Sequence, residues 1–293
     1  MQTPGNKLCY SRNLELGRIM FVFCQAVVCL LLALPAVARS QAFASITIKP
    51  ALSADPRKER VQVLPNGDLI ATAVPVITLL SYAYDVPVNP SPRLFSLPDW
   101  TFREKYDIEA KAPVYAISPH LQYREVRRRI RQMIRGLLAD RFKLVMRLEN
   151  KTMSVYALTL ADGGPKLQRS MLSNKDCIFD TEPEGCHSFV GGFGHPLNAN
   201  AVNMDDLAYY IGNWTDLPVV NGTALNGMFT VSTEGWVPMR LPPPPPNTTP
   251  DVSHFVGLPS IFAVLRKLGL ELKRREDVLP VYTVERIQRP GAN

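Results

Sequence analysis

The chain has 293 residues, of which 46% are hydrophobic, and its formal net charge is +7 at pH 7. This length and apolar content provide a substantial core in one or two domains. The positive charge does not indicate nucleic-acid binding, because much of it lies in the N-terminal segment and in one arginine-rich helix, and no nucleic-acid-binding motif is present. A solvated helix face explains the arginines most simply, and a polyanionic envelope partner is the alternative.

Residues 1–42 have the pattern of a secretory signal peptide. Lys7, Arg12 and Arg18 precede the apolar run Ile19–Leu34, and small residues lead up to a cleavage site after Ala42. The pattern predicts an extracytoplasmic protein, either periplasmic or secreted. The alternative is an uncleaved membrane anchor, since the apolar run is slightly long for a signal peptide.

Residues 43–170 form the first predicted unit. Alternation typical of strands occurs in Phe43–Lys49, Val61–Val63, Leu69–Ala73 and Tyr106–Lys111. The turn sequence Pro65-Asn66-Gly67-Asp68 predicts a hairpin between the second and third of these segments. Pro75 stands where the first turn of a helix tolerates proline, so a short helix is expected to follow it.

An amphipathic helix forms the centre of this unit. Its apolar residues recur at helical spacing, namely Ile130, Met133, Ile134, Leu137 and Leu138. Arg127, Arg128, Arg131 and Arg135 occupy its other faces. Two short strands are expected after the helix, Phe142–Met146 and Val155–Thr159, separated by a polar turn at Asn150 and Lys151.

Residues 187–293 form a second predicted unit with the same order of elements. Ala71–Tyr84 aligns without gaps on Ala199–Gly212, and Phe229–Thr233 takes the place of Tyr106–Ala110. The segment Ile261–Val284 repeats the arginine-rich helix and its two strands. The sequence therefore predicts an α+β protein with an internal duplication, in which each half lays two helices on one face of a mostly antiparallel sheet. A polyproline loop at 242–246 interrupts the second half.

Cys177 and Cys186 are the two cysteines that remain after the predicted signal peptide. An even pair around Pro183 and Gly185 predicts a disulfide that closes a connecting loop, residues 171–186, in an oxidising compartment. The alternative is a metal site formed with His187 and His195. Its spacing fits no standard zinc pattern, so we predict no metal.

Several stretches together resemble one protein family. They are SITIKP (Ser45–Pro50), LPDW followed by YDIEAKAP, MIRGLLADRFKL, VYALTLADGGPKL (Val155–Leu167) and VERIQRP. Over nearly the whole mature length, the chain resembles a soil-associated family of exported bacterial proteins with no assigned function. That family usually carries an aspartate and a glycine where this chain has Asn221 and Ala224, and an aspartate where it has Thr230.

The resemblance implies a role in binding. Some family members resemble fusions behind a membrane metallopeptidase of the antibiotic-sensor type, which implies sensing or binding rather than catalysis. The helix–strand–strand units also resemble, more faintly, the short N-terminal domain of secretins and TonB-dependent receptors. A likeness at the level of fold carries little information about function.

The sequence contains no signature of a catalytic nucleophile, a zinc peptidase or a phosphate-binding loop. It therefore predicts a non-catalytic binding or interaction module of the bacterial envelope, with no cofactor and with an envelope protein or glycan as partner. Contact with a membrane is expected only through an uncleaved N-terminal segment. The alternative is an envelope hydrolase acting on glycan or peptide with paired carboxylates, either Asp99 with Asp107 or Asp205 with Asp206.

The candidate ligand-binding residues are Trp100, Asp107, Asn221 and Phe229. They occupy corresponding loop-to-strand positions of the two predicted halves. Because similar halves commonly leave a cleft at their junction, we expect these side chains to line a groove there.

Overall fold

The computed structural model describes residues 42–52, 58–87, 91–118, 120–178, 185–192, 194–240 and 252–291. The predicted signal peptide, except for Ala42, and the polyproline loop at 242–246 lie outside these residues. Within the described part, helices accompany three mostly antiparallel sheets, which confirms the α+β class. No helix in that part is both long enough and apolar enough to cross a membrane.

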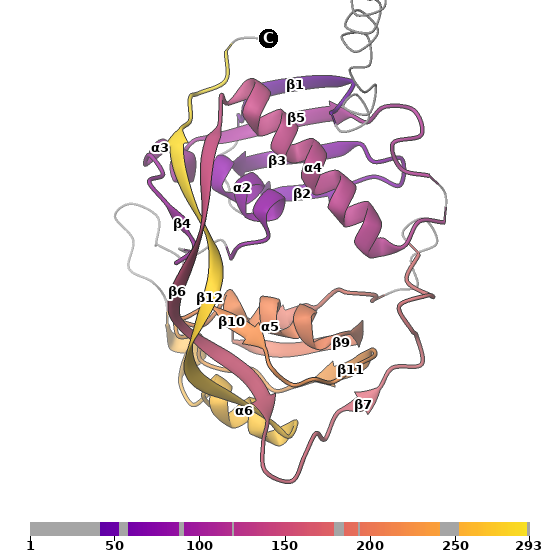
Figure 1. Ribbon diagram of the computed structural model, residues 1–293, viewed down its shortest axis with the longest axis vertical. Coiled ribbons are helices and arrows are strands. Elements are labelled where there is room, and N and C mark those ends of the chain that lie inside the picture. Colours follow the sequence, from indigo (N-terminus) through magenta and orange to yellow (C-terminus); the bar gives the residue numbers. More distant parts are fainter. Residues whose placement is uncertain are drawn as a thin grey trace, which may run out of the picture. The chain divides into compact units, whose positions relative to one another are not determined.

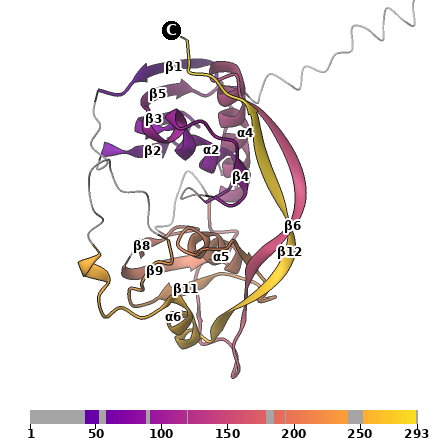
Figure 2. The ribbon, with the colours of Figure 1, turned by 90° about the vertical axis from the view of Figure 1, so that its left-hand side faces the viewer.

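The first sheet has the strand order β1-β5-β3-β2, and all its neighbouring strands are antiparallel. Its strands are β1 (Ser45–Pro50), β2 (Arg60–Val63), β3 (Leu69–Pro75) and β5 (Lys105–Lys111). The predicted hairpin joins β2 to β3, and Gly67 adopts φ +91° in its turn, a conformation that favours glycine. The helices α2 (Val76–Tyr84) and α4 (Tyr123–Arg141) cover one face of this sheet (Figures 1 and 2).

The predicted apolar stripe of α4 is confirmed. All five of its residues are buried, and Val126 extends the stripe by one turn toward the N-terminus of the helix. The helix ends at Arg141, and the residue after it, Phe142, is fully buried. Burial of one continuous apolar face against the sheet leaves the arginines on the remaining faces.

The second sheet has the order β7-β11-β9-β8. Its strands are β7 (Gln168–Arg169), β8 (Val190–Gly192), β9 (His195–Val202) and β11 (Phe229–Ser232). The helices α5 (Met204–Gly212) and α6 (Ile261–Lys267) share one apolar core with this sheet. The shorter elements are α3 (Trp100–Arg103), η3 (Ser253–Phe255), β4 (Leu94–Phe95) and β10 (Val219–Asn221).

Two long strands, β6 (Val145–Leu160) and β12 (Leu270–Arg286), run antiparallel side by side (Figures 1 and 2). The prediction of two short strands with a polar turn at Asn150 and Lys151 is therefore wrong. Asn150 is paired with Pro280 and Lys151 with Leu279, so β12 continues the ladder through this segment. Polar residues are tolerated there because their side chains are exposed on this two-stranded ribbon of β6 and β12.

The first and second sheets correspond strand by strand. In the first, Val74 of β3 is paired with Tyr106 of β5, and in the second, Val202 of β9 is paired with Phe229 of β11. A bulge lies beside each pair, between Ala71 and Val74 of β3 and between Ala199 and Val202 of β9, which are equivalent positions in the alignment. The two-halves arrangement nevertheless fits only loosely, because β6 and β12 pair with each other in a third sheet rather than joining the sheet of their own half.

Candidate functional site

A cavity of about 300 Å³ lies among charged side chains that come from both predicted halves. Its lining residues are Asp85, Arg124, Arg127, Arg131, Asp205, Asp206 and Tyr209. Four of them come from α4 and from the residue that ends α2, and three come from the first turns of α5. Three guanidinium groups and three carboxylates therefore surround one space.

The arginine wall of the cavity follows from helical spacing. Arg124, Arg127 and Arg131 are separated by three and four residues, so they share one face of α4. Two neighbouring arginines on the helix, Arg128 and Arg129, pair with Glu125 and do not line the cavity. Arg128 donates to Glu125 at 2.6 Å and Arg129 donates to it at 2.8 Å, and these hydrogen bonds lower the pKa of Glu125 to about 2.

Asp85 is the acidic residue on the arginine side of the cavity. It ends α2 in the left-handed conformation, with φ 56°. Its carboxylate accepts a hydrogen bond from Arg131 and lies 3.9 Å from the Nη2 atom of Arg127. Burial of Arg127 opposes its positive charge, but the surrounding tyrosines and acids, Asp85 among them, outweigh burial and raise the pKa of Arg127.

Asp205 and Asp206 form the opposite wall, at the N-terminus of α5. Asn203 caps this helix, since its side chain accepts from the backbone N–H groups of both aspartates. Asp206 completes a capping box by accepting from the Asn203 backbone at 3.0 Å. Asp205 accepts from the Asn221 side chain at 2.8 Å. These hydrogen bonds fix the positions of both carboxylates.

Tyr209 belongs to α5 and lies on the side of that helix near α2. Its hydroxyl lies near the buried Ser81 of α2. Burial of the ring and the nearby Asp85 carboxylate raise the pKa of Tyr209, so the phenol stays neutral at physiological pH. The cavity therefore has an aromatic wall between its two charged walls.

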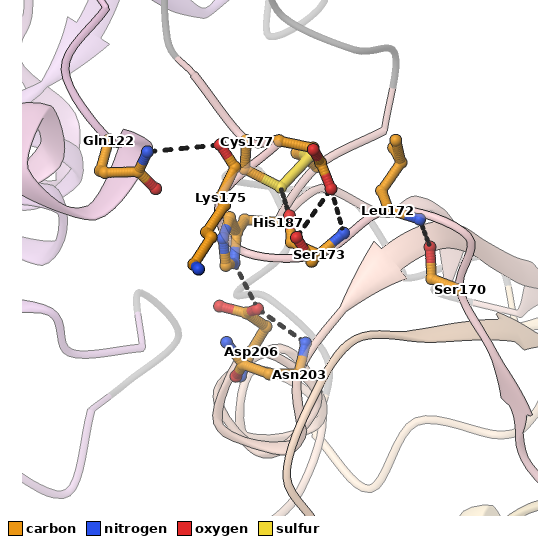
Figure 3. Close-up of a disulfide and its surroundings, with 11 residues drawn as sticks. Gln122, Ser170, Leu172, Ser173, Lys175, Cys177, His187, Asn203 and Asp206 are labelled. Carbon is orange, nitrogen blue, oxygen red and sulfur yellow. Dashed lines mark hydrogen bonds and ion pairs between the residues drawn. A yellow bond between two sulfur atoms is a disulfide. The ribbon is translucent and has the colours of Figure 1, made fainter.

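The predicted disulfide between Cys177 and Cys186 is present, and it lies close to this cavity (Figure 3). His187 follows Cys186 directly, and its Nδ1 atom lies 2.6 Å from Asp206. The imidazole also stacks on Tyr123, with 5.1 Å between the ring centres. In addition, the Tyr123 backbone N–H donates to the Cys177 carbonyl at 3.0 Å. The disulfide segment thus contacts the first residue of α4 and the first turn of α5.

The structure does not bring the four predicted ligand-binding residues together in this cavity. Asn221 adjoins it through Asp205, whereas Phe229 is buried in the second core, with 3% of its surface exposed. The guanidinium of Arg169 lies over the Phe229 ring at 5.1 Å. A cation–π contact on the ring and burial in the core account for Phe229 without a ligand.

Trp100 and Asp107 also have structural partners. The Asp107 carboxylate accepts from the Ala73 backbone N–H at 2.8 Å, at the bulge between β3 and β5. Trp100 begins α3, and the guanidinium of Arg289 lies over its ring at 5.2 Å. Trp100 thus packs against the C-terminal segment rather than in the arginine-lined cavity.

A larger space of about 570 Å³ lies beside that C-terminal segment. Its charged groups are largely paired with each other, because Arg289 donates to both carboxylate oxygens of Glu104, at 2.6 and 2.9 Å. Tyr106 also donates to Glu104, and its burial and this hydrogen bond raise the pKa of Tyr106 to about 12. With fewer free charged groups, this space is the weaker candidate for a ligand site.

The arginine-lined cavity was not found from the sequence, although parts of its signal were visible. The arginine spacing predicts a solvated helix face or a polyanionic partner. The sequence suggests Asp206 as part of a helix start and Asp205 with Asp206 as a hydrolytic pair, but neither pattern predicts that the two groups face each other. The two aspartates in fact contact different partners, Asn221 and His187. Within the described ranges, histidine, cysteine, aspartate and glutamate side chains form no group of three suited to a metal ion.

Comparisons with known proteins place the chain in a family. No curated protein and no solved structure matches it. A family model described as "Protein of unknown function (DUF3738)" matches residues 77–287, a range that includes every residue lining the cavity. Since this range covers more than half of the 293 residues, the chain belongs to the DUF3738 family of proteins of unknown function.

Proposed function

We propose that this protein is a non-catalytic binding module that works outside the cytoplasm and holds a small charged ligand between α4 and α5. The observation that carries the proposal is the cavity of about 300 Å³ with arginines on one wall and aspartates on the other. Concave sites with a few converging polar groups are the usual places where small ligands bind. Both charged walls are set on helices, which favours a preorganised site.

The hydrogen bonds of the acids support binding rather than hydrolysis. A hydrolytic pair needs one carboxyl group to donate a proton while the other activates water or attacks the substrate. Here Asp206 accepts from His187 and from the Asn203 backbone, and Asp205 accepts from Asn221. Asp85 accepts from Arg131. Each carboxylate thus has a donor that fixes its position, as a ligand-positioning group requires.

The location outside the cytoplasm rests on two features of the chain. Residues 1–42 have the composition of a signal peptide, and Cys177 and Cys186 form a disulfide, a bond that persists mainly in oxidising compartments. The resemblance to a soil-associated exported family, and the fainter one to the short domain of secretins and TonB-dependent receptors, agree with this location. An envelope protein or glycan remains the proposed partner.

Thermal unfolding of the full-length protein against a panel of small carboxylates, phosphates, amines and amino acids tests the binding module. We expect at least one compound to raise the unfolding temperature in a saturable way, because a ligand that binds only the folded state stabilises it. The variant Arg124→Gln/Asp205→Asn should lose this response. The control Arg128→Gln/Asp162→Asn, which changes exposed residues outside the cavity, should keep it.

A parallel screen for turnover of envelope glycans and peptides tests the hydrolase alternative. The binding module predicts no product release. Turnover that disappears in Asp205→Asn or Asp206→Asn would establish the hydrolase instead. If no compound of the panel stabilises the wild-type protein, the cavity is not a site for small charged molecules.

A further inference from the structure

We infer that the ligand is a small zwitterion whose carboxylate binds Arg124 and Arg127 and whose ammonium binds the aspartates of α5. This inference rests on the proposed function and names the chemical class of its ligand. The simplest compounds of this class are amino acids. The charged groups that retain unused hydrogen-bonding capacity in the cavity determine which ligand fits.

On the arginine wall, most of the free capacity lies with Arg124 and Arg127. Arg131 donates to Asp85 through Nη2, while its buried Nε–H has no partner among the described residues. The Nη2 atom of Arg127 lies 3.9 Å from Asp85, which is longer than a hydrogen bond. Among the described residues, no side chain or backbone group pairs with the Arg124 guanidinium. Each guanidinium offers five N–H donors in a planar fork that matches a carboxylate, so this wall can bind one.

On the aspartate wall, one oxygen of each carboxylate is free. Asn221 occupies Oδ1 of Asp205, whereas His187 and the Asn203 backbone occupy Oδ2 of Asp206. No described residue donates to the other oxygen of either carboxylate. An ammonium group has three N–H donors and no acceptor, so it can pair with a free carboxylate oxygen on this wall.

The two walls together favour a zwitterion over an anion or a cation. A phosphate or dicarboxylate would bind the arginines, but Asp205 and Asp206 across the cavity would repel it. A simple amine would meet the reverse repulsion from Arg124 and Arg127. Arg127 already interacts electrostatically with Asp206, yet no ion pair joins these two residues in the described structure. A ligand with both charges can fill the space between them.

The size of the cavity limits the ligand to a small molecule. Its volume of about 300 Å³ is at the low end of the range for ligand sites. The cavity also has equal numbers of guanidinium and carboxylate groups, three of each. A ligand without net charge preserves that balance, which is a further reason to expect a zwitterion rather than an ion of one sign.

Calorimetric titration of the full-length protein tests the inference directly. The probes are glycine, β-alanine and 4-aminobutyrate, which carry the same two charged groups at increasing separation. Each is compared with its N-acetyl derivative, which lacks the ammonium, and its amide, which lacks the carboxylate. We expect one zwitterion to bind saturably and each derivative to bind at least about tenfold more weakly, because each loses one charge-assisted contact.

Two variants locate the contacts. Arg124→Gln should weaken the zwitterion and its N-acetyl derivative but change the amide little, because the amide has no carboxylate. Asp205→Asn should weaken the zwitterion and the amide but change the N-acetyl derivative little. Arg128→Gln, on the exposed side of the same helix, is the control and should change none of the three dissociation constants.

The outcomes separate this inference from the proposed function. If an N-acetyl derivative binds as tightly as its parent amino acid, the site is an anion site, and the zwitterion is excluded while the binding module stands. If none of the three amino acids binds, the zwitterion inference is also overturned. The binding module itself is then decided by the wider panel of compounds in thermal unfolding.

Discussion

The Nδ1 atom of His187 lies 2.6 Å from a carboxylate oxygen of Asp206, although 19 residues separate them in the chain. This contact joins the disulfide segment to the first turn of α5, at the edge of the arginine-lined cavity (Figure 3). The His187 side chain is almost fully buried, with 2% of it exposed. A hydrogen bond to a charged group at such a site contributes more than one at the surface.

Replacement of His187 by phenylalanine tests this contact. His187→Phe keeps an aromatic ring to stack on Tyr123 but removes the hydrogen bond to Asp206. We expect the free energy of unfolding to fall by about 1–3 kcal/mol, because the partly buried Asp206 loses a partner. Urea denaturation measures the change. The exposed His195→Phe is the control, and equal stability of the two variants would mean that the contact contributes nothing.

The disulfide itself should stabilise the fold. Cys177→Ser/Cys186→Ser removes a bond that closes a loop with a sequence separation of nine residues. We expect the free energy of unfolding to fall by about 2–3 kcal/mol, the usual contribution of a loop of this length. Chemical denaturation of the double variant and the oxidised wild-type protein measures it. In the intact wild-type protein, a reductant should raise the mass by about 2 Da, the mass of two hydrogens, and no mass change would show free thiols.

Asp107 is expected to matter for stability and not for ligand binding. Its carboxylate accepts from the Ala73 N–H, and Ala73 has φ 50° in the bulge of β3. Asp107→Ala should therefore lower the free energy of unfolding by about 1–3 kcal/mol, since it leaves that N–H without its acceptor. Asp107→Asn keeps an acceptor oxygen and should cost much less. A loss of ligand affinity in a fully folded Asp107→Asn would contradict this assignment.

Glu125 should give the N-terminal turn of α4 a measurable pH dependence. Hydrogen bonds from Arg128 and Arg129 lower its pKa from 4.5 to about 2. Because the folded pKa is below the unfolded one, the stabilisation is fully present above about pH 4.5 and is lost as the pH falls toward 2. With 32% of the side chain exposed, we expect only about 0.2–1 kcal/mol from these pairs.

Titration of the Glu125 carboxyl carbon by NMR checks this pH dependence. A midpoint near the ordinary glutamate value would contradict the assigned hydrogen bonds. The variant Glu125→Gln supplies the control for stability. Its difference from the wild-type protein should be largest at neutral pH and should shrink as the pH falls below about 4.

Much of the fold could be predicted because its signals are local. The buried stripe of α4 follows from helical spacing, and the turn around Gly67 follows from residues that favour positive φ. The sequence does not predict the two-stranded ribbon of β6 and β12, and the reason is physical. Asn150 and Lys151 have the composition of a turn, but their backbone groups pair with β12, more than a hundred residues away in the chain. A strand held by such a distant partner leaves no local signal.

The cavity was missed for a similar reason. Its two walls lie on segments some eighty residues apart, and their proximity depends on tertiary packing. Periodicity placed Arg127 and Arg131 on the polar faces of a helix, but it did not include Arg124 and did not show what those faces oppose. The position of Asp85 depends on a left-handed helix end, which its sequence context did not reveal.

The most direct test of the central claim is to map a bound amino acid onto the protein by NMR. We would titrate 4-aminobutyrate, glycine and β-alanine into isotopically labelled protein and follow the backbone amides and the arginine Nε–H groups. We expect saturable shifts confined to the start of α4, Asp85 and the first turn of α5. Shifts centred on Glu104 and Arg289, or no shifts with any of the three compounds, would contradict that claim.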